Sequence, residues 1–390
     1  MQVFSVLLYP IQHQVIAAPS CLLETLTTPY QTLAANGQFR LVSINHQQLN
    51  TLAKHKHKSN LSPCGGFINV TTAWNSLSKK QTTSQENVSQ FLVKYTQQPR
   101  YSLRNETYRI QYPEQVAEVI QKLNPQEMWN NLTALTNFED RYANSNHGVL
   151  AAEWIKNKVL SFARDYHRDD VTVYTVSNSY MQPSVVAKFG NSTEAGVVIG
   201  AHMDTLSSFW GRKPGADDDG SGTVTILETA RAILSSGIQF KKPLYFIWYA
   251  AEEEGLVGSG YVVSDFKNKH IPVHAVIQMD MTGYTYKNKP DLWLIKDYVN
   301  NDLTKYLEQL IKTYVKQPVQ YTQCGYACSD HASWTQEGFV AAMPSESAYE
   351  EMNQSIHTSQ DTMEKLSLNH MTDFAKLATS FAVELGEPKN

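Results

Sequence analysis

The chain has 390 residues and a mass of 44.0 kDa, which suits two domains better than one, since a domain usually takes about 100–200 residues. Hydrophobic residues make up 42% of it and charged residues 18%, so it can bury a core and is neither disordered nor fibrous. No apolar run approaches the roughly 18–20 residues of a membrane span, and a net charge of −4 argues against a nucleic-acid-binding protein.

The first twenty residues have some features of an export signal. Residues 3–9 are apolar, and residues 16–20 contain small side chains like those at signal cleavage sites. Two features count against a signal, because no Lys or Arg follows Met1 and Pro10 interrupts the apolar stretch. Residues 1–20 are therefore assigned as a candidate signal segment, with both interpretations open.

Residues 21–110 form a basic module rich in Gln, Asn, Ser and Thr. Residues 21–109 contain ten Lys and Arg but only three Glu and no Asp, a net charge of +7, whereas the rest of the chain has −11. A basic patch occupies 54–58, and a strand-like run at 39–44 predicts a small α+β unit. Because opposite fields favour association, the charges favour docking of this module on the acidic remainder; chance composition is the alternative.

From residue 111 to the C-terminus, helical and strand patterns alternate. Helices are predicted at 116–123, 149–162, 223–235, 302–315 and 371–385. Strands are predicted at 171–174, 185–189, 196–200, 244–249, 273–278, 292–295 and 339–343. Short apolar strands separated by amphipathic helices predict an α/β fold, in which a mainly parallel sheet lies between two layers of helices.

Polar side chains suited to metal binding follow four of these strands. The residues concerned are His202, Asp204, Asp218, Glu252, Glu253, Asp280 and His357. Because ligands in open α/β sheets bind outside the carboxyl ends of the strands, we expect these side chains to converge on one rim.

Two imidazoles and several carboxylates in one dry place require a compensating charge. A pair of divalent cations supplies it, since His, Asp and Glu are zinc ligands and a carboxylate can bridge two metals. Asp204 is placed to orient the His202 imidazole from behind. Five ligands for two metals leave coordination positions open, which favours a catalytic site. Taken singly, a His-x-Asp pair is usually a surface pair, and an acidic triplet such as 217–219 is usually a helix start.

The sequence resembles the secreted bacterial leucyl aminopeptidases, which are co-catalytic di-zinc enzymes, from about residue 114 to the C-terminus. The segments that carry the resemblance are His202-Met203-Asp204, Pro214-Gly215-Ala216-Asp217-Asp218-Asp219-Gly220-Ser221-Gly222, Tyr249-Ala250-Ala251-Glu252-Glu253, Gln278-Met279-Asp280-Met281-Thr282, Cys324-Gly325-Tyr326-Ala327-Cys328-Ser329-Asp330-His331-Ala332-Ser333-Trp334 and Ile356-His357-Thr358-Ser359-Gln360-Asp361-Thr362. The resemblance implies the zinc exopeptidase fold, a three-layer α/β/α domain at 111–390 preceded by a pro-region.

The resemblance also implies the roles of the site residues. Two Zn²⁺ ions would be bound with Asp218 as the bridge: His202 and Asp280 on one ion, Glu253 and His357 on the other. The peptide after the bridging residue would be cis, and Glu252 would be the general base for an activated water. The free α-amine of a peptide would bind one zinc, which limits cleavage to the first residue, and Tyr326 would donate to the developing oxyanion.

Substrate preference follows from the residues that match the family's pocket. The lining that carries over consists of Met281, Ile295, Tyr349, Ile356 and the Cys324–Cys328 loop. This apolar set suits Leu and similar side chains. Ser345 and Met352 stand where the family has aromatic residues, so a preference for Lys or Arg is the alternative.

The resemblance implies a disulfide between Cys324 and Cys328, and hence an oxidising compartment. The protein is therefore predicted to be secreted, through the periplasm if it is bacterial, and to be a monomer. Residues 21–110 would serve as an intramolecular inhibitor and folding aid, removed by a processing protease near 100–112; a permanent accessory domain is the alternative. Cys21 and Cys64 could pair, or Cys64 could be a free thiol or contact a zinc ion.

Other classes fit the sequence less well. A carboxypeptidase or deacylase of the same wider fold would need a cation for the substrate carboxylate, usually Arg, and no Arg follows Arg231. A glutaminyl-cyclase-like enzyme uses one zinc and does not need the full bridging set. An inert, receptor-like homologue would lose ligands or the base, and this chain keeps all six.

Overall fold

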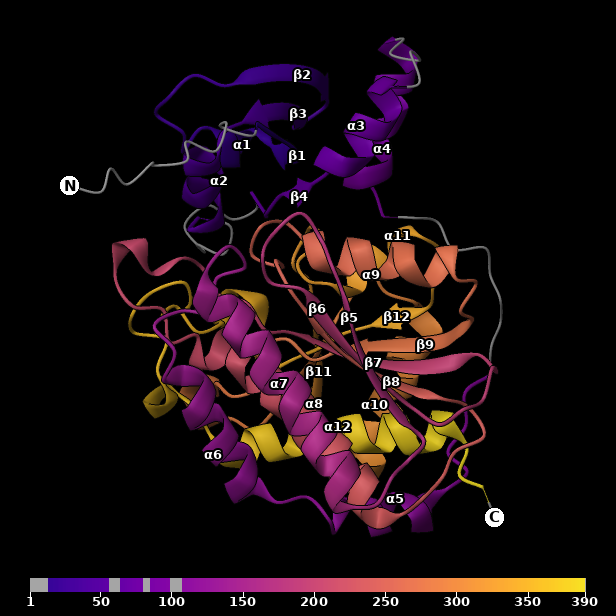
Figure 1. Cartoon of the computed structure of the whole chain (residues 1–390). Coiled ribbons are helices and arrows are strands. Elements are labelled where there is room, and N and C mark those ends of the chain that lie inside the picture. The colour runs from indigo at the N-terminus through magenta and orange to yellow at the C-terminus, as the bar shows by residue number, and fades with distance from the viewer. Residues whose placement is uncertain (1–12, 56–63, 80–84, 99–106, 390) are drawn as a thin grey trace, which may run out of the picture. The chain divides into compact units, whose positions relative to one another are not determined.

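The computed structural model describes residues 13–55, 64–79, 85–98 and 107–389, which Figure 1 shows in colour. They belong to two compact units, Met1–Gln97 and Gln98–Asn390, each described by itself below. The division falls earlier in the chain than the predicted boundary at 110/111. Residues 1–12 of the candidate signal, 56–58 of the basic patch and most of the predicted processing region lie outside the described residues.

The N-terminal unit is the small α+β unit that the sequence predicts. Its antiparallel sheet has the order β2-β3-β1-β4, with β1 at Gln14–Pro19, β2 at Gln31–Asn36, β3 at Phe39–Ile44 and β4 at Ile68–Asn69. Its helices are α1 (Ser20–Leu23), α2 (His46–Ala53), α3 (Thr71–Lys79) and α4 (Gln85–Thr96). Asn45 caps α2, because its side-chain oxygen accepts the Gln48 backbone amide at 2.9 Å. The Gln48 side-chain oxygen in turn accepts the Asn45 backbone amide.

Strand β1 overlaps the candidate signal segment. It pairs with β3 on one side and β4 on the other, and Val15, Ile16, Ala17 and Ala18 are buried. Cleavage at the small residues near 17–20 would remove a strand with two neighbours, and the signal boundary at residue 20 stays a prediction.

The cysteines of this unit are paired. Cys21 and Cys64 form a disulfide with their Cα atoms 5.6 Å apart. The two alternatives of a free Cys64 thiol and a Cys64–zinc contact are therefore wrong.

The second unit is built on a six-stranded mixed sheet of order β12-β9-β7-β8-β6-β5. Its strands are β5 (Val171–Val176), β6 (Ser184–Phe189), β7 (Gly196–His202), β8 (Leu244–Tyr249), β9 (Val273–Gln278) and β12 (Ala341–Ala342). The pairs among β12, β9, β7 and β8 are parallel, whereas β6 and β5 are antiparallel to their neighbours. Every residue of β7 and β8 is buried, which explains why both strands are apolar throughout.

Helices cover both faces of this sheet, as predicted (Figure 1). They are α5 (Pro113–Ile120), α6 (Pro125–Thr136), α7 (Asn146–Asp165), α8 (Gly222–Ser236), α9 (Val257–Asn268), α10 (Asn301–Leu310), α11 (His331–Gln336) and α12 (Leu368–Gly386). Helices α7, α8 and α12 pack on one face, and α9 and α11 pack on the other. Two separate hydrophobic clusters fill the two interfaces, so the domain has three layers. Within the described residues, no helix is both long and apolar enough to cross a membrane.

The structure corrects the prediction at the later strands. Residues 292–295 form β10, which belongs to a separate three-stranded sheet with β11 (Val319–Thr322) and β13 (Pro344–Ser345). The strand predicted at 339–343 is reduced to the two residues of β12, because the Phe339 amide donates to the Trp334 carbonyl instead. Helices α6, α9 and α11 and strands β11 and β13 were not predicted.

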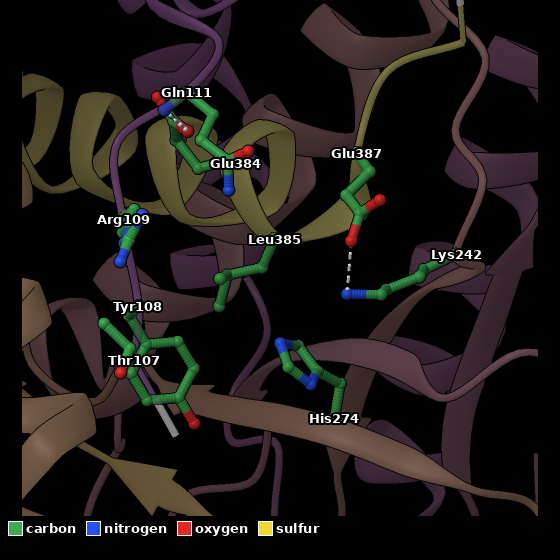
Figure 2. A pocket seen from close by; sticks show the side chains of 9 residues that line it. All are labelled: Thr107, Tyr108, Arg109, Gln111, Lys242, His274, Glu384, Leu385 and Glu387. Carbon is green, nitrogen blue, oxygen red and sulfur yellow. Dashed lines mark hydrogen bonds and ion pairs between the residues drawn. The ribbon is translucent and has the colours of Figure 1, made fainter. Parts of the chain in front are cut away.

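Residues 107–112 belong structurally to the second unit. The Glu384 carboxylate on α12 accepts the amides of Gln111 at 2.7 Å and Tyr112 at 3.2 Å. The Tyr108 ring stacks on Tyr306 with centroids 5.3 Å apart. Together with Lys242 and His274, which lie near the amino ends of β8 and β9, this segment lines a cavity of about 270 Å³ that is shown in Figure 2.

Candidate metal centre

The five predicted metal donors come together at the carboxyl edge of the six-stranded sheet. His202 is the last residue of β7, and Glu253 and Asp280 follow the ends of β8 and β9. Asp218 lies in the turn that leads into α8, and His357 lies in the loop before α12. All five side chains are at most 9% exposed. The convergence expected from the strand ends is therefore present.

Asp218 contacts both imidazoles, one through each of its carboxylate oxygens. Its Oδ1 lies 3.1 Å from Nε2 of His202, and its Oδ2 lies 3.0 Å from Nε2 of His357. Glu253 Oε2 is 3.1 Å from the same His357 nitrogen, and Asp280 Oδ1 is 3.6 Å from the His202 nitrogen. One carboxylate thus connects two imidazole–carboxylate pairs.

The donor set fits two divalent cations. The donors form two groups of three, and within each group the donor atoms all lie within 4.8 Å of one another. The first group is His202, Asp219 and Asp280, and the second is Asp218, Glu253 and His357. Imidazole nitrogens and carboxylate oxygens in groups of this size are the ligands of catalytic zinc, which keeps a coordination position open for water or substrate. The cluster could therefore hold one cation between each imidazole and its carboxylates.

Asp219 belongs to the first group by distance but makes a different set of contacts. Its oxygens accept the backbone amides of His202 at 3.1 Å, Gly222 at 2.9 Å and Met281 at 3.0 Å. Asp218 instead directs both oxygens at the imidazoles. Asp219 therefore holds three backbone segments around the cluster, and Asp218 is better placed to bridge two cations. The peptide bond between them is cis, as the family resemblance implied.

The carboxylates raise the pKa of both imidazoles. Burial by itself lowers the pKa of His202, but Asp280, Asp204 and Asp218 outweigh it and raise that pKa well above the ordinary value. For His357, burial is again outweighed, here by Glu253 and Asp218, and its pKa rises to about 10. Without a cation, both rings therefore hold a proton at neutral pH. These protons supply the positive charge that bound cations would otherwise supply.

Cation binding should therefore release protons even above neutral pH. At about pH 8, where an ordinary histidine is already deprotonated, zinc binding to the metal-free protein is expected to release a proton from the His357 imidazole, whose pKa is raised to about 10. Calorimetric titration in two buffers of different ionisation enthalpy counts the protons. Zinc binding with no proton release at this pH would contradict the interpretation.

Asp204 lies behind His202, as predicted from the sequence. Its Oδ1 is 3.4 Å from Nδ1 of His202, on the side of the ring away from Asp218. The two Asp204 oxygens also accept the backbone amides of Glu252 at 3.0 Å and Glu253 at 3.2 Å. The single Asp204 carboxylate therefore fixes both the His202 imidazole and the loop that carries Glu252.

The predicted oxyanion and pocket residues lie next to this cluster. Burial, Tyr349, Glu252 and Asp280 raise the pKa of Tyr326 well above its ordinary value, so its hydroxyl stays protonated. The Tyr326 and Tyr349 hydroxyls are 3.5 Å apart, and their rings meet edge to face. One apolar cluster contains Ile295, Tyr326, Cys328 and Met343, with Cys324 and Tyr349 packed against it.

The structure also shows the second cysteine pair and the two remaining residues of the predicted pocket. Cys324 and Cys328 form a disulfide, as the resemblance implied. Met281 and Ile356 are buried, but neither belongs to the apolar cluster around Tyr326.

Two residues that bond to the backbone around the metal donors were not singled out from the sequence. Asp361 accepts the amides of Asp217 and Asp218, each at 3.1 Å, and so holds the bridging residue from the loop after His357. The sequence did mark Asp361, because it lies in the segment 356–362 that carries the family resemblance. Arg141 is fully buried beside this turn, and no pattern in the sequence marks it.

Comparison with known proteins gives a consistent result. A family model described as peptidase family M28 matches residues 184–382. Leucine aminopeptidase 1 of Emericella nidulans is 39% identical over 296 residues, which cover 72% of this chain and 76% of that protein. The crystal structure of LapA aminopeptidase from Legionella pneumophila is 41% identical with a TM-score of 0.88, and the match covers 97% of this chain and 99% of that one. The crystal structure of LapB from the same organism is 40% identical with a TM-score of 0.86, covering 96% and 100%.

Proposed function

The chain belongs to peptidase family M28 and is a metallo-aminopeptidase, and from this premise we propose that it removes the N-terminal residue from peptides with two Zn²⁺ ions bound on either side of Asp218. The observation that carries the proposal is the division of the Asp218 oxygens between two imidazoles, at 3.1 and 3.0 Å. His202 and Asp280 would complete the ligands of one ion, and Glu253 and His357 those of the other.

The bound ions would polarise the scissile carbonyl and lower the pKa of a water molecule. The other steps belong to side chains of this chain. Glu252 takes a proton from the water as the water oxygen bonds to the carbonyl carbon, and it gives that proton to the amine nitrogen as the C–N bond breaks. The Asp204 carboxylate keeps Glu252 in place through the Glu252 backbone amide at 3.0 Å. Tyr326, whose hydroxyl is held protonated, donates to the oxygen that gains negative charge.

We propose that Leu and similar apolar side chains are preferred at the first position. The cluster of Ile295, Cys328 and Met343 beside Tyr326 supplies an apolar surface. A pocket for Lys or Arg would need an acid directed at the substrate side chain, whereas the Glu346 carboxylate is buried and one of its oxygens accepts the Tyr284 amide. The Ser345 hydroxyl is also engaged, since it donates to the Ser347 carbonyl at 3.0 Å. The name of the Emericella nidulans relative agrees with this preference.

A panel of aminoacyl anilides tests this function. We expect Leu anilide to be cleaved with a kcat/KM at least about 10-fold above that of Lys anilide, because the apolar pocket gains from burying an alkyl chain and not an ammonium. N-acetyl-Leu anilide is the matched control, and it should not be cleaved because it lacks the free α-amine. Cleavage of the acetylated substrate would rule out an aminopeptidase, and a higher kcat/KM for Lys anilide would select the alternative preference.

We further propose that the protein is exported. The disulfides Cys21–Cys64 and Cys324–Cys328 support an oxidising compartment, where such bonds persist. Any export signal would end before Gln14, since β1 begins there.

The N-terminal unit is proposed as an inhibitory pro-region. Its support is electrostatic, since residues 21–109 have a net charge of +7 and the rest of the chain −11. Limited proteolysis of the full chain before Thr107 is expected to raise activity, and adding the separated N-terminal fragment back at low ionic strength is expected to lower it. Full activity of the uncut chain would favour a permanent accessory domain instead.

A further inference from the structure

Three consecutive residues, Glu139 to Arg141, make hydrogen bonds to the loop that connects His202 to the turn containing Asp218. We call these three residues the 139–141 clamp. The Glu139 carbonyl accepts the Lys213 amide at 3.0 Å, and Asp140 Oδ2 accepts the Ser208 amide at 3.0 Å. The backbone amide of Arg141 donates to Thr205 Oγ1 at 2.9 Å. The clamp therefore contacts the beginning, the middle and the end of the loop at 203–215.

The Arg141 guanidinium joins the two ends of this loop. It is fully buried, and its Nε donates to the Met203 carbonyl at 2.8 Å. Its Nη1 and Nη2 donate to the carbonyls of Pro214 at 2.6 Å and Gly215 at 2.7 Å. Met203 directly follows His202, and Gly215 lies three residues before Asp218. One rigid fork thus ties together the backbone on both sides of the loop, next to two metal donors.

Gly215 allows the guanidinium to approach the bridging turn this closely. Its φ of +52° lies in the left-handed region, and a Cβ at this position would meet Arg141 Nη2 at 2.8 Å and the Asp218 carbonyl oxygen at 2.7 Å. No side chain fits between the fork and the turn. The position of Asp218 therefore depends directly on that of Arg141.

The charge of Arg141 also suits this place. Burial lowers its pKa, and the field of Asp361, Asp219, Asp204 and Asp218 acts in the opposite direction. Burial has the larger effect, so the pKa of Arg141 is lowered, but the guanidinium is charged at neutral pH because its ordinary pKa is so high. All three of its side-chain hydrogen bonds named above go to backbone carbonyls.

We propose that Arg141 is a positioning residue for the metal centre, which sets the separation of His202 from Asp218 and so the affinity of the cation that these two residues share. This inference rests on the proposed two-zinc site. The guanidinium hydrogen bonds named above all go to backbone carbonyls, so Arg141 would act through the backbone. Lysine cannot replace it, because a single ammonium does not reproduce a planar fork with donors directed at three carbonyls.

The test compares the zinc affinity of Arg141→Lys with that of the wild-type chain. Competition with a chelator, read as zinc content per chain, is expected to show about 10–100-fold weaker binding of one of the two ions, as for other groups that orient metal ligands. Excess zinc should restore kcat to within about threefold, with KM unchanged, because substrate contacts are not altered. Arg231→Lys is the matched control, since that guanidinium contacts Glu228 and the Tyr166 hydroxyl and no member of the metal cluster.

A milder variant keeps the test decisive if Arg141→Lys does not fold. Thr205→Val removes the acceptor of the Arg141 amide, together with the bond that the Thr205 hydroxyl donates to the adjacent Leu206 carbonyl at 3.1 Å. It is expected to weaken the same ion by about 3–10-fold. Wild-type zinc affinity in a folded Arg141→Lys or Thr205→Val protein would overturn the inference. A wild-type chain that binds fewer than two zinc ions would instead contradict the proposed function, so the two failures are distinguishable.

Discussion

Replacing Glu252 by Gln is expected to lower kcat by about 10²–10⁴-fold while the protein still binds two zinc ions per chain. The amide has the same size as the carboxylate but cannot take a proton from water. The loop should keep its position, because Asp204 holds it through the backbone amides of Glu252 and Glu253, which the substitution does not change. Steady-state kinetics and zinc content, measured on the same sample, check both parts.

Glu254→Gln provides the matched control for this substitution. Glu254 is buried in the same loop and accepts the Tyr180 hydroxyl at 3.0 Å, a bond that an amide oxygen can also accept. Burial raises the pKa of Glu254 to about 7, so a neutral side chain is already partly populated there. We expect its kcat to stay within about threefold of wild type, because its carboxylate contributes no proton transfer. A Glu252→Gln protein with wild-type kcat would remove Glu252 from the role of general base.

Replacing Asp218 by Asn should abolish activity through loss of the metals themselves. An amide has one oxygen to share where the carboxylate has two, so it cannot contact both imidazoles as Asp218 does at 3.1 and 3.0 Å. Zinc content is expected to fall for both ions and not for one alone, because the bridge is common to both. Elemental analysis after gel filtration measures it.

Asp219→Asn separates the bridge from its neighbour. Asp219 accepts three backbone amides, so this variant should keep its zinc but lose about 1–3 kcal/mol of unfolding free energy, because a buried donor is left without an acceptor. If Asp219→Asn lost zinc and Asp218→Asn retained it, the two residues would have to exchange roles.

The centre of the sheet could be predicted because β7 and β8 are buried on both faces. Residues 244–249 and 273–278 match β8 and β9 in both bounds, since continuous apolar runs end where the backbone leaves the sheet. His202, Glu253 and Asp280 could be located for the same reason, because each lies at or just after the end of such a run. Asp218 and His357 lie in loops and were located by the motifs that carry the family resemblance. Residues 292–295 were also found as a strand, but apolarity does not specify the partner, and β10 pairs in a different sheet.

Elements whose signal is spread over polar sequence were missed. Helix α6 begins with an Asn124 cap and Pro125, but its buried Met128, Leu132 and Leu135 are separated by Asn and Thr. Arg141 could not be found at all. Its partners are backbone carbonyls more than sixty residues away. Every residue has a backbone carbonyl, so the residue types at those positions do not reveal the contact.

The attachment of Gln111 and Tyr112 to Glu384 places the beginning of the second unit beside its last helix. Adjacent ends make this unit a candidate for circular permutation, with new termini opened in a surface loop and the old ones joined by a short linker. The same attachment would limit where the proposed pro-region can be removed. A cut before Thr107 would keep the Gln111 and Tyr112 amides on the Glu384 carboxylate, whereas a cut beyond Tyr112 would leave that buried carboxylate without these two donors.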